Sequence, residues 1–144
     1  MSAAIDLPQL LVERTAAPLN SACIACGDKN THGLHLRFSR RGHMAAADWT
    51  PCQTQEGFRG VIHGGVIATV LDEAMSKAVV YRGWEALTVE LTIRLRAKVK
   101  PGENLTVLGM ILTKRKREIQ TEACIIDAAG RERAHAWAKF LVVR

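Results

Sequence analysis

The segment from residue 60 to residue 80, GVIHGGVIATVLDEAMSKAVV, constrains the fold more than any other part of the chain. At helical spacing its apolar side chains cover most of the circumference, and a helix that is apolar on nearly every side is normally buried. The apolar positions are Val66, Ile67, Val70, Leu71, Ala74, Met75, Ala78 and Val79. The segment therefore predicts one long helix that the rest of the domain must enclose.

The enclosing layer is predicted to come mainly from the second half of the chain, which has the pattern of β-strands. Residues 105–113, 118–127 and 133–143 are three such strands, and residues 34–39 and 43–49 read as a hairpin. A further strand over residues 87–99 has an unbroken apolar face made of Leu87, Val89, Leu91, Ile93, Leu95, Ala97 and Val99. We expect an α+β domain with an antiparallel sheet of five to six strands wrapped around one long central helix, although layer packing alone allows other α+β arrangements.

Length and composition are those of an ordinary globular protein. The 144 residues predict a single domain over residues 1–144, in which residues 1–22 form an N-terminal extension with a short helix over residues 6–15. No apolar run approaches the ~20 residues of a membrane span, and the N-terminus lacks the basic start of a signal peptide. We therefore expect a cytoplasmic protein without membrane contact, whose four cysteines are thiols.

The charge balance bears on the kind of ligand. The net charge of +6 suits an anionic partner such as a nucleic acid, a membrane surface or a phosphorylated small molecule. Only 5% of the residues are aromatic, so the stacking surfaces expected of a single-strand nucleic-acid binder are scarce. We expect no nucleic-acid partner.

Two acidic residues, Asp72 and Glu73, interrupt the apolar helix. Adjacent helical residues point about 100° apart, so the two carboxylates cannot share a face. Glu73 has Lys77 one turn later, in the order that favours an ion pair, and we interpret it as a charge on the wetter side of the helix. Asp72 has no basic partner within a turn, and an uncompensated carboxylate on a buried helix costs several kcal/mol. Asp72 is therefore the favoured functional residue. Two alternatives stay open: Asp72 could be a solvated acid at the edge of the helix, or Glu73 could have the functional role.

The residues His63, Gly64 and Gly65 come directly before the apolar run. The first N–H groups of a helix lack partners within the helix and carry the positive end of its dipole. Glycines at this place let a substrate approach the backbone closely. The N–H groups could then polarise a carbonyl oxygen as an oxyanion hole. The alternative is a tight strand-to-helix turn with no catalytic role.

The spacing between these two features limits the mechanism. Gly64 and Asp72 are eight residues apart, which is about 12 Å along a helix. A nucleophile and oxyanion donors must both lie within about 3 Å of one reacting carbonyl, so a single chain cannot form the whole site. Two antiparallel helices related by a two-fold axis can bring Asp72 of one chain to Gly64 of the other. The functional interpretation therefore predicts a homodimer, and it leaves a dimer of dimers, a homotetramer, open.

Three segments carry a resemblance to a known family: CIACGDKNTHGLHLRF (residues 23–38), GFRGVIHGGVIATVLDEAM (57–75) and LTVELTIRLRAKVKPGE (87–103). With them the chain resembles the hotdog-fold acyl-CoA thioesterases, in particular the phenylacetate-pathway-like branch. The resemblance implies the hotdog fold and hydrolysis of an acyl-CoA to a free acid and CoA, with no cofactor.

The same resemblance implies roles for four residues. Asp72, nine residues after the histidine of HGG, corresponds to the nucleophile or general base, and Gly64 to the residue whose amide polarises the carbonyl. His63 corresponds to a residue that orients the site or contacts the leaving sulfur. Thr88, at the start of the strand after the helix, corresponds to one that helps to place the attacking water.

Basic residues gather at the end of the strand predicted over 87–99 and in the turn at 114–117. On their own they could be solvated charges that discourage edge-to-edge strand pairing. The resemblance favours a platform for the 3′-phosphate and pyrophosphate of CoA. The predicted substrate-binding residues are Gly65, Arg96, Lys98, Lys100, Lys114, Arg115 and Lys116.

A pair of cysteines, Cys23 and Cys26, is followed by His32 and His35. The spacing C-x2-C-x5-H-x2-H is far shorter between its pairs than in usual zinc modules. His35 also alternates with two leucines, as a strand residue would. We therefore predict a structural loop and no metal site.

Two other functions fit the same features. A hotdog dehydratase would use a histidine and an acid that converge, with His63 facing Asp72 of the partner chain. A non-catalytic acyl-CoA binder or sensor would keep the cleft and the basic platform but would not need Asp72. The reaction product, free thiol or enoyl-CoA, separates hydrolysis from dehydration. The sequence does not predict which acyl chain is bound.

Overall fold

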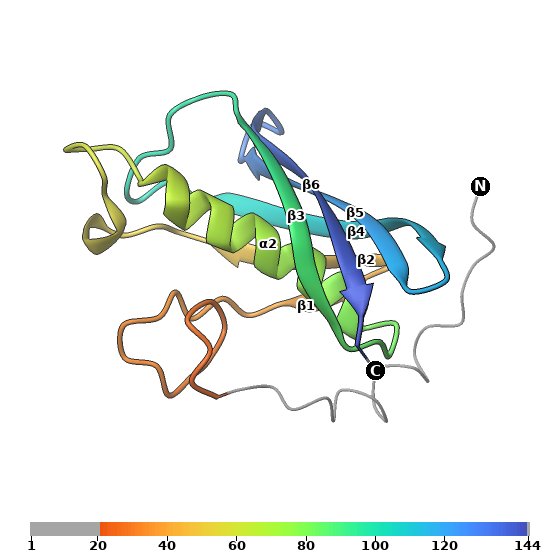
Figure 1. Cartoon of the computed structure of the whole chain (residues 1–144). Coiled ribbons are helices and arrows are strands. Elements are labelled where there is room, and N and C mark those ends of the chain that lie inside the picture. Colours follow the sequence, from red (N-terminus) through yellow and green to blue (C-terminus); the bar gives the residue numbers. More distant parts are fainter. Residues whose placement is uncertain (1–20, 144) are drawn as a thin grey trace.

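The structure, a computed structural model, describes residues 21–143 of the chain (Figure 1). The helix predicted over residues 6–15 lies outside the described residues. Within them, the α-helix α2 (Gly64–Val80) packs on one antiparallel sheet of six strands, and a short 3-10 helix, Gln53–Gln55, precedes it. The strands are β1 (Ser39–Arg41), β2 (Met44–Trp49), β3 (Ala86–Leu95), β4 (Leu105–Arg115), β5 (Glu118–Asp127) and β6 (Glu132–Val142). The expected α+β hotdog arrangement is confirmed.

The strands follow the order β1-β2-β4-β5-β6-β3 across the sheet, and every neighbouring pair is antiparallel. β2 precedes α2 in the chain and β3 follows it. In the sheet, β4, β5 and β6 lie between these two strands, and α2 packs across the face that the five strands share (Figure 1). β3 is consequently an edge strand. No helix in residues 21–143 has both the length and the apolar content required to cross a membrane.

A row of small residues supports α2 at the centre of the sheet. Ala45, Gly109, Ala123 and Ala136 are paired in turn across β2, β4, β5 and β6, and all four are buried. A Cβ atom on Gly109 would lie 2.3 Å from the carbonyl oxygen of Ala74, so only glycine lets the helix backbone come this close. Larger buried side chains, among them Leu71, Met75, Ile119 and Phe140, complete the core around this contact.

A β-bulge in β3, directly after Thr88, changes which side chains face the helix. Before the bulge Thr88 pairs with the buried Phe140, and after it Leu91 pairs with the buried Ala138. Directly paired residues share a face of the sheet, so Thr88 and Leu91 both face α2. The expected unbroken apolar face of this strand is therefore wrong, because the extra residue of the bulge leaves Leu87, which is 62% exposed, on the other side.

The hairpin expected in the first half of the chain is confirmed in part. Residues 43–49 correspond to β2, but the strand predicted over residues 34–39 begins only at Ser39. The backbone N–H groups of Leu34 and Leu36 donate instead to the carbonyl oxygens of Ile24 and Ala25, at 2.8 and 2.9 Å. This stretch therefore folds back on the loop that contains the cysteine pair.

The close contact at Gly109 gives a test of the fold. We expect Gly109→Ala to lower the free energy of unfolding by about 1–3 kcal/mol, because the new methyl group must push α2 off the sheet. Denaturant unfolding followed by circular dichroism measures this change. Thr113→Ala, at an exposed position of the same strand, is the control and should change the stability by no more than about 0.5 kcal/mol. A Gly109→Ala variant as stable as the control would contradict the described packing.

Candidate active site

Asp72 lies in the middle of α2 on the side that faces β3. The hydroxyl group of Thr88 donates a hydrogen bond to Asp72 Oδ1 at 2.8 Å. Burial raises the pKa of the Asp72 carboxyl group, and the hydrogen bond from Thr88 opposes this rise only in part. No cation in residues 21–143 forms an ion pair with this carboxylate. The structure thus joins two of the predicted site residues into one hydrogen-bonded pair, which is half-buried.

Glu73 points to a different side of the helix, as the 100° rotation between neighbours requires. Its carboxylate forms the expected pair with Lys77, at 3.7 Å. The expectation that this pair is exposed is wrong, because the side chains of Glu73 and Lys77 are only 15% and 10% exposed. The Sγ atom of Cys23 lies 3.8 Å from the other carboxylate oxygen of Glu73, so the loop at residues 23–26 covers this side of α2.

The start of α2 is arranged by His63. Its Nδ1 atom accepts a hydrogen bond from the backbone N–H of Gly65 at 2.8 Å, so His63 caps the helix. The N–H of Gly65 is therefore occupied. The N–H of Gly64 makes no hydrogen bond within residues 21–143, and it lies at the positive end of the helix dipole. Of the two glycines, Gly64 has the amide that is available to a ligand.

A cavity of about 570 Å³ opens beside this amide. Its walls come from the loop before α2 and from the end of β3. The lining residues are Gly57, Phe58, Val61, Ile62, His63, Gly64 and Leu95. Asp72 is not among them, in keeping with the distance of about 12 Å expected along the helix. Within one chain, the carboxylate of Asp72 and the free N–H of Gly64 therefore lie at separate sites.

The predicted substrate-binding lysines and arginines lie at opposite ends of α2. The backbone N–H of Ile62 donates to the carbonyl oxygen of Val99, so the segment with Arg96, Lys98 and Lys100 runs beside the start of the helix. The turn with Lys114, Arg115 and Lys116 lies beyond the other end, where Lys114 Nζ is 5.0 Å from the ring centroid of Trp84. A 17-residue helix is about 25 Å long, so one chain does not bring the two groups together.

The two groups also differ in how their charges are paired. Arg96 forms an ion pair with Glu132 at 2.5 Å, whereas Lys98 and Lys100 have exposed side chains. The Nζ of Lys114 donates to the carbonyl oxygen of Lys116 at 2.6 Å. Sequence reasoning missed Trp84, whose contact with Lys114 depends on a turn that follows α2.

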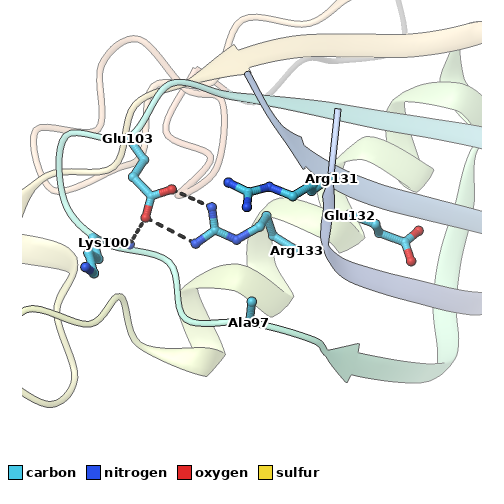
Figure 2. A pocket seen from close by; sticks show the side chains of 6 residues that line it. All are labelled: Ala97, Lys100, Glu103, Arg131, Glu132 and Arg133. Atoms are coloured by element: carbon cyan, nitrogen blue, oxygen red, sulfur yellow. Dashed lines mark hydrogen bonds and ion pairs between the residues drawn. The ribbon is translucent and has the colours of Figure 1, made fainter. Parts of the chain in front are cut away.

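A second cavity, of about 500 Å³, lies near Lys100 and is drawn in Figure 2. Figure 2 shows Glu103 reaching toward the guanidinium group of Arg133 and the backbone of Lys100. Arg133 pairs with Glu103 at 2.5 Å and with Asp127 at 3.4 Å, and it also donates to the carbonyl oxygen of Lys98. The hydrogen bond from Arg133 lowers the pKa of Glu103. Arg131 also pairs with Asp127, at 3.0 Å, so two arginines balance two acids, and we assign this network to the support of the 97–103 turn.

The sequence of residues 59–134 matches the family model of the Thioesterase superfamily, and this span is more than half of the 144 residues. The chain therefore belongs to the thioesterase superfamily. No protein with curated annotation matches the chain significantly.

Solved structures of other proteins share the fold. Protein RHA08564, a thioesterase superfamily protein, is 23% identical with a TM-score of 0.79; the match covers 83% of this chain but only 62% of that protein. A hypothetical thioesterase from Streptococcus pneumoniae TIGR4, solved with coenzyme A, is 18% identical with a TM-score of 0.71, and the match covers 75% of this chain and 85% of that one. The E. coli PaaI protein, from the phenylacetic acid degradation operon, is 18% identical with a TM-score of 0.72, over 77% and 81% of the two chains.

The environment of Asp72 predicts that replacing its carboxylate by a neutral amide stabilises the fold, by an amount that depends on pH. Because the pKa of this carboxyl group is raised in the folded chain, its charged form destabilises the fold. That effect is absent below the unfolded pKa of about 3.9 and complete above the folded pKa. We expect the stability of Asp72→Asn relative to the wild type to rise between about pH 3.5 and pH 7, as measured by denaturant unfolding.

Asp28→Asn is the matched control for this measurement, because Asp28 is exposed. Its stability relative to the wild type should stay nearly constant over the same pH range. An Asp72→Asn difference that is equally flat would show that the folded chain does not penalise the Asp72 carboxylate.

Proposed function

We propose that the protein hydrolyses acyl-CoA thioesters, and that Asp72 is its nucleophile or general base. The observation that carries this proposal is the half-buried Asp72 carboxylate, which has no cationic partner in residues 21–143 and whose orientation is fixed by Thr88. A carboxylate kept in this way costs stability, which a structural role alone does not account for. Perturbed carboxyl groups of this kind are typical of catalytic sites.

A relative adds support to this assignment. In the Streptococcus pneumoniae protein that was solved with coenzyme A, an aspartate and a threonine sixteen positions apart have each been replaced by alanine for structural study. Asp72 and Thr88 are separated by the same sixteen positions in this chain. The correspondence supports the choice of Asp72 over Glu73 and gives Thr88 a place in the same site.

The chemistry requires three elements around the thioester carbonyl. The N–H of Gly64 would donate to the carbonyl oxygen and stabilise the negative charge that develops on it. Asp72 would either attack the carbonyl carbon to form an anhydride, which water then hydrolyses, or take a proton from a water that attacks directly. In both routes the carbon–sulfur bond breaks and CoA leaves as a thiolate that takes up a proton. Thr88 would hold the carboxylate in position for either route.

The active site requires a second copy of the chain. About 12 Å of helix separates Asp72 from the free amide of Gly64, and the two do not share a cavity. The edge strand β3 supports pairing with another copy, because it exposes Leu87, Val89, Leu91 and Leu95. A two-fold arrangement of antiparallel helices would place Asp72 of one protomer near Gly64 of its partner. It would also bring the Lys114–Lys116 turn of one protomer toward the Lys98 and Lys100 segment of the other, where both could bind the phosphates of CoA.

Replacing the proposed catalytic acid tests the function directly. Asp72→Asn keeps the size of the side chain but removes its nucleophilic and basic character. We expect kcat for a responsive acyl-CoA to fall about 100-fold or more with little change in substrate affinity. Release of free CoA thiol over a panel of acyl-CoAs measures this, and mass spectrometry distinguishes the free acid from an enoyl-CoA.

Ser76→Ala is the control, because Ser76 lies one helical turn beyond Asp72 and is partly exposed. It should keep kcat within about twofold. Undiminished turnover by a folded Asp72→Asn variant would refute the assignment of Asp72. Formation of an enoyl-CoA would favour the dehydratase alternative, and binding without turnover would favour the non-catalytic binder.

Mixed dimers test whether the site is shared between chains. Gly64→Pro removes the free N–H, and the backbone suits it: Gly64 is the first residue of α2, and His63 has φ −59° and ψ 134°, which a following proline permits. We expect Asp72→Ala and Gly64→Pro homodimers each to be nearly inactive. After subunit exchange, mixed dimers should regain activity, because half of the composite sites then contain both groups.

Gly64→Ala is the control for the proline variant. It keeps the N–H, and its new methyl group meets only the flexible side chain of Leu95, at 3.3 Å. It should therefore keep most of the activity. No recovery in mixed dimers that light scattering and native mass spectrometry show to have formed would contradict a shared site.

A further inference from the structure

Three side chains with metal-binding atoms meet on the side of α2 that Asp72 does not use. The sulfur atoms of Cys23 and Cys26 and a carboxylate oxygen of Glu73 all lie within 4.8 Å of one another, and all three residues are partly buried. The Sγ of Cys23 is 3.8 Å from Glu73 Oε2. The thioester chemistry proposed above uses none of them.

The loop that carries the cysteines is folded tightly around them. Gly27, directly after Cys26, is buried, and its N–H donates to the carbonyl oxygen of Cys23 at 2.9 Å. A Cβ atom on Gly27 would lie 2.4 Å from the backbone nitrogen of Cys23, so no other residue fits this turn. The two thiols are thereby held on one side of the loop, toward α2.

The charge around the cluster favours a divalent cation over free thiolates. The amine of Lys77 neutralises Glu73 from the far side, at 3.7 Å. If one divalent cation replaces two thiol protons, the net charge of Cys23, Cys26, Glu73 and Lys77 stays at zero.

We infer that Cys23, Cys26 and Glu73 form a binding site for a zinc ion or a similar soft divalent cation. With Zn–S bonds of about 2.3 Å and a Zn–O bond of about 2.1 Å, tetrahedral ligands lie about 3.6–3.8 Å apart. The 3.8 Å between Cys23 and Glu73 is already in this range, and the limit of 4.8 Å leaves only small side-chain rotations to complete it. The fourth position is open to water.

A metal ion explains the cluster better than a disulfide does. A disulfide between Cys23 and Cys26 would leave Glu73 without a reason to lie among the sulfur atoms. This inference departs from the expectation of no metal, and its proposed third ligand is Glu73, not one of the two histidines that follow the cysteines. His35 instead contacts the carbonyl oxygen of Asn30 through Nε2, at 2.5 Å.

Cobalt is a suitable probe, because Co²⁺ occupies zinc sites and absorbs light. The full chain is reduced, stripped with a chelator and titrated with Co²⁺. We expect saturation at one equivalent, with a thiolate-to-cobalt charge-transfer band in the near ultraviolet and the intense visible bands of four-coordinate Co²⁺. Added Zn²⁺ should remove both. Cys23→Ser and Cys26→Ser should each weaken or abolish the charge-transfer band, and Glu73→Gln should weaken binding about tenfold or more.

Cys124→Ser and Cys52→Ser are the matched controls, since both residues are thiols outside the cluster, and both should titrate like the wild type. Thiol labelling of the wild type gives a result that does not depend on how the variants fold. Zn²⁺ should protect Cys23 and Cys26 from alkylation and leave Cys52 reactive. No charge-transfer band in the wild type, a band that survives both cysteine replacements, or equal labelling with and without Zn²⁺ would overturn the inference.

Discussion

The close contact between α2 and the row of small residues beneath it fixes the rest of the structure. Because Gly109 has no side chain, the helix backbone rests directly on β4 at Ala74 and Met75. The rotation of α2 then decides where every residue of the helix points. Asp72 is turned toward β3 and Glu73 toward the loop at residues 23–26.

This rotation gives two adjacent acids opposite electrostatic conditions. Glu73 has a buried cation beside it, so its charge is balanced inside the domain. Asp72 has only a hydroxyl group, and its carboxyl group therefore has a raised pKa. A half-buried carboxylate without a cationic partner is available for chemistry. This contrast supports the two proposals, catalysis at Asp72 and metal binding on the side that holds Glu73.

The edge position of β3 connects the fold to the proposed assembly. Its outer edge lacks a neighbouring strand in residues 21–143, and its exposed leucines and valine add apolar surface there. The bulge after Thr88 matters for the same strand, because it lets the hydroxyl group of Thr88 and the apolar residues beyond it face α2 together. The one extra residue of the bulge thus allows both the hydrogen bond from Thr88 to Asp72 and the packing of apolar side chains of β3 against α2.

The sequence alone determined the buried helix and most of the strands, and it singled out the candidate catalytic acid. The apolar circumference of residues 66–79 required a buried helix, the alternation in the second half required strands, and the lack of a basic partner within a turn singled out Asp72. These signals are local, since each depends on residues within one or two turns or along one strand. The glycines at the start of the helix pointed to Gly64 as a candidate oxyanion donor, and the resemblance added Thr88 to the candidate site.

Only the tertiary structure decided which distant residues meet. The sheet order, the bulge that turns Thr88 toward Asp72, and the burial of the pair between Glu73 and Lys77 all depend on contacts between separate elements. The same holds for the approach of Glu73 to Cys23, which lies fifty residues earlier in the chain. Such contacts follow from how the helix and the sheet pack in three dimensions, and no periodicity along the chain encodes them.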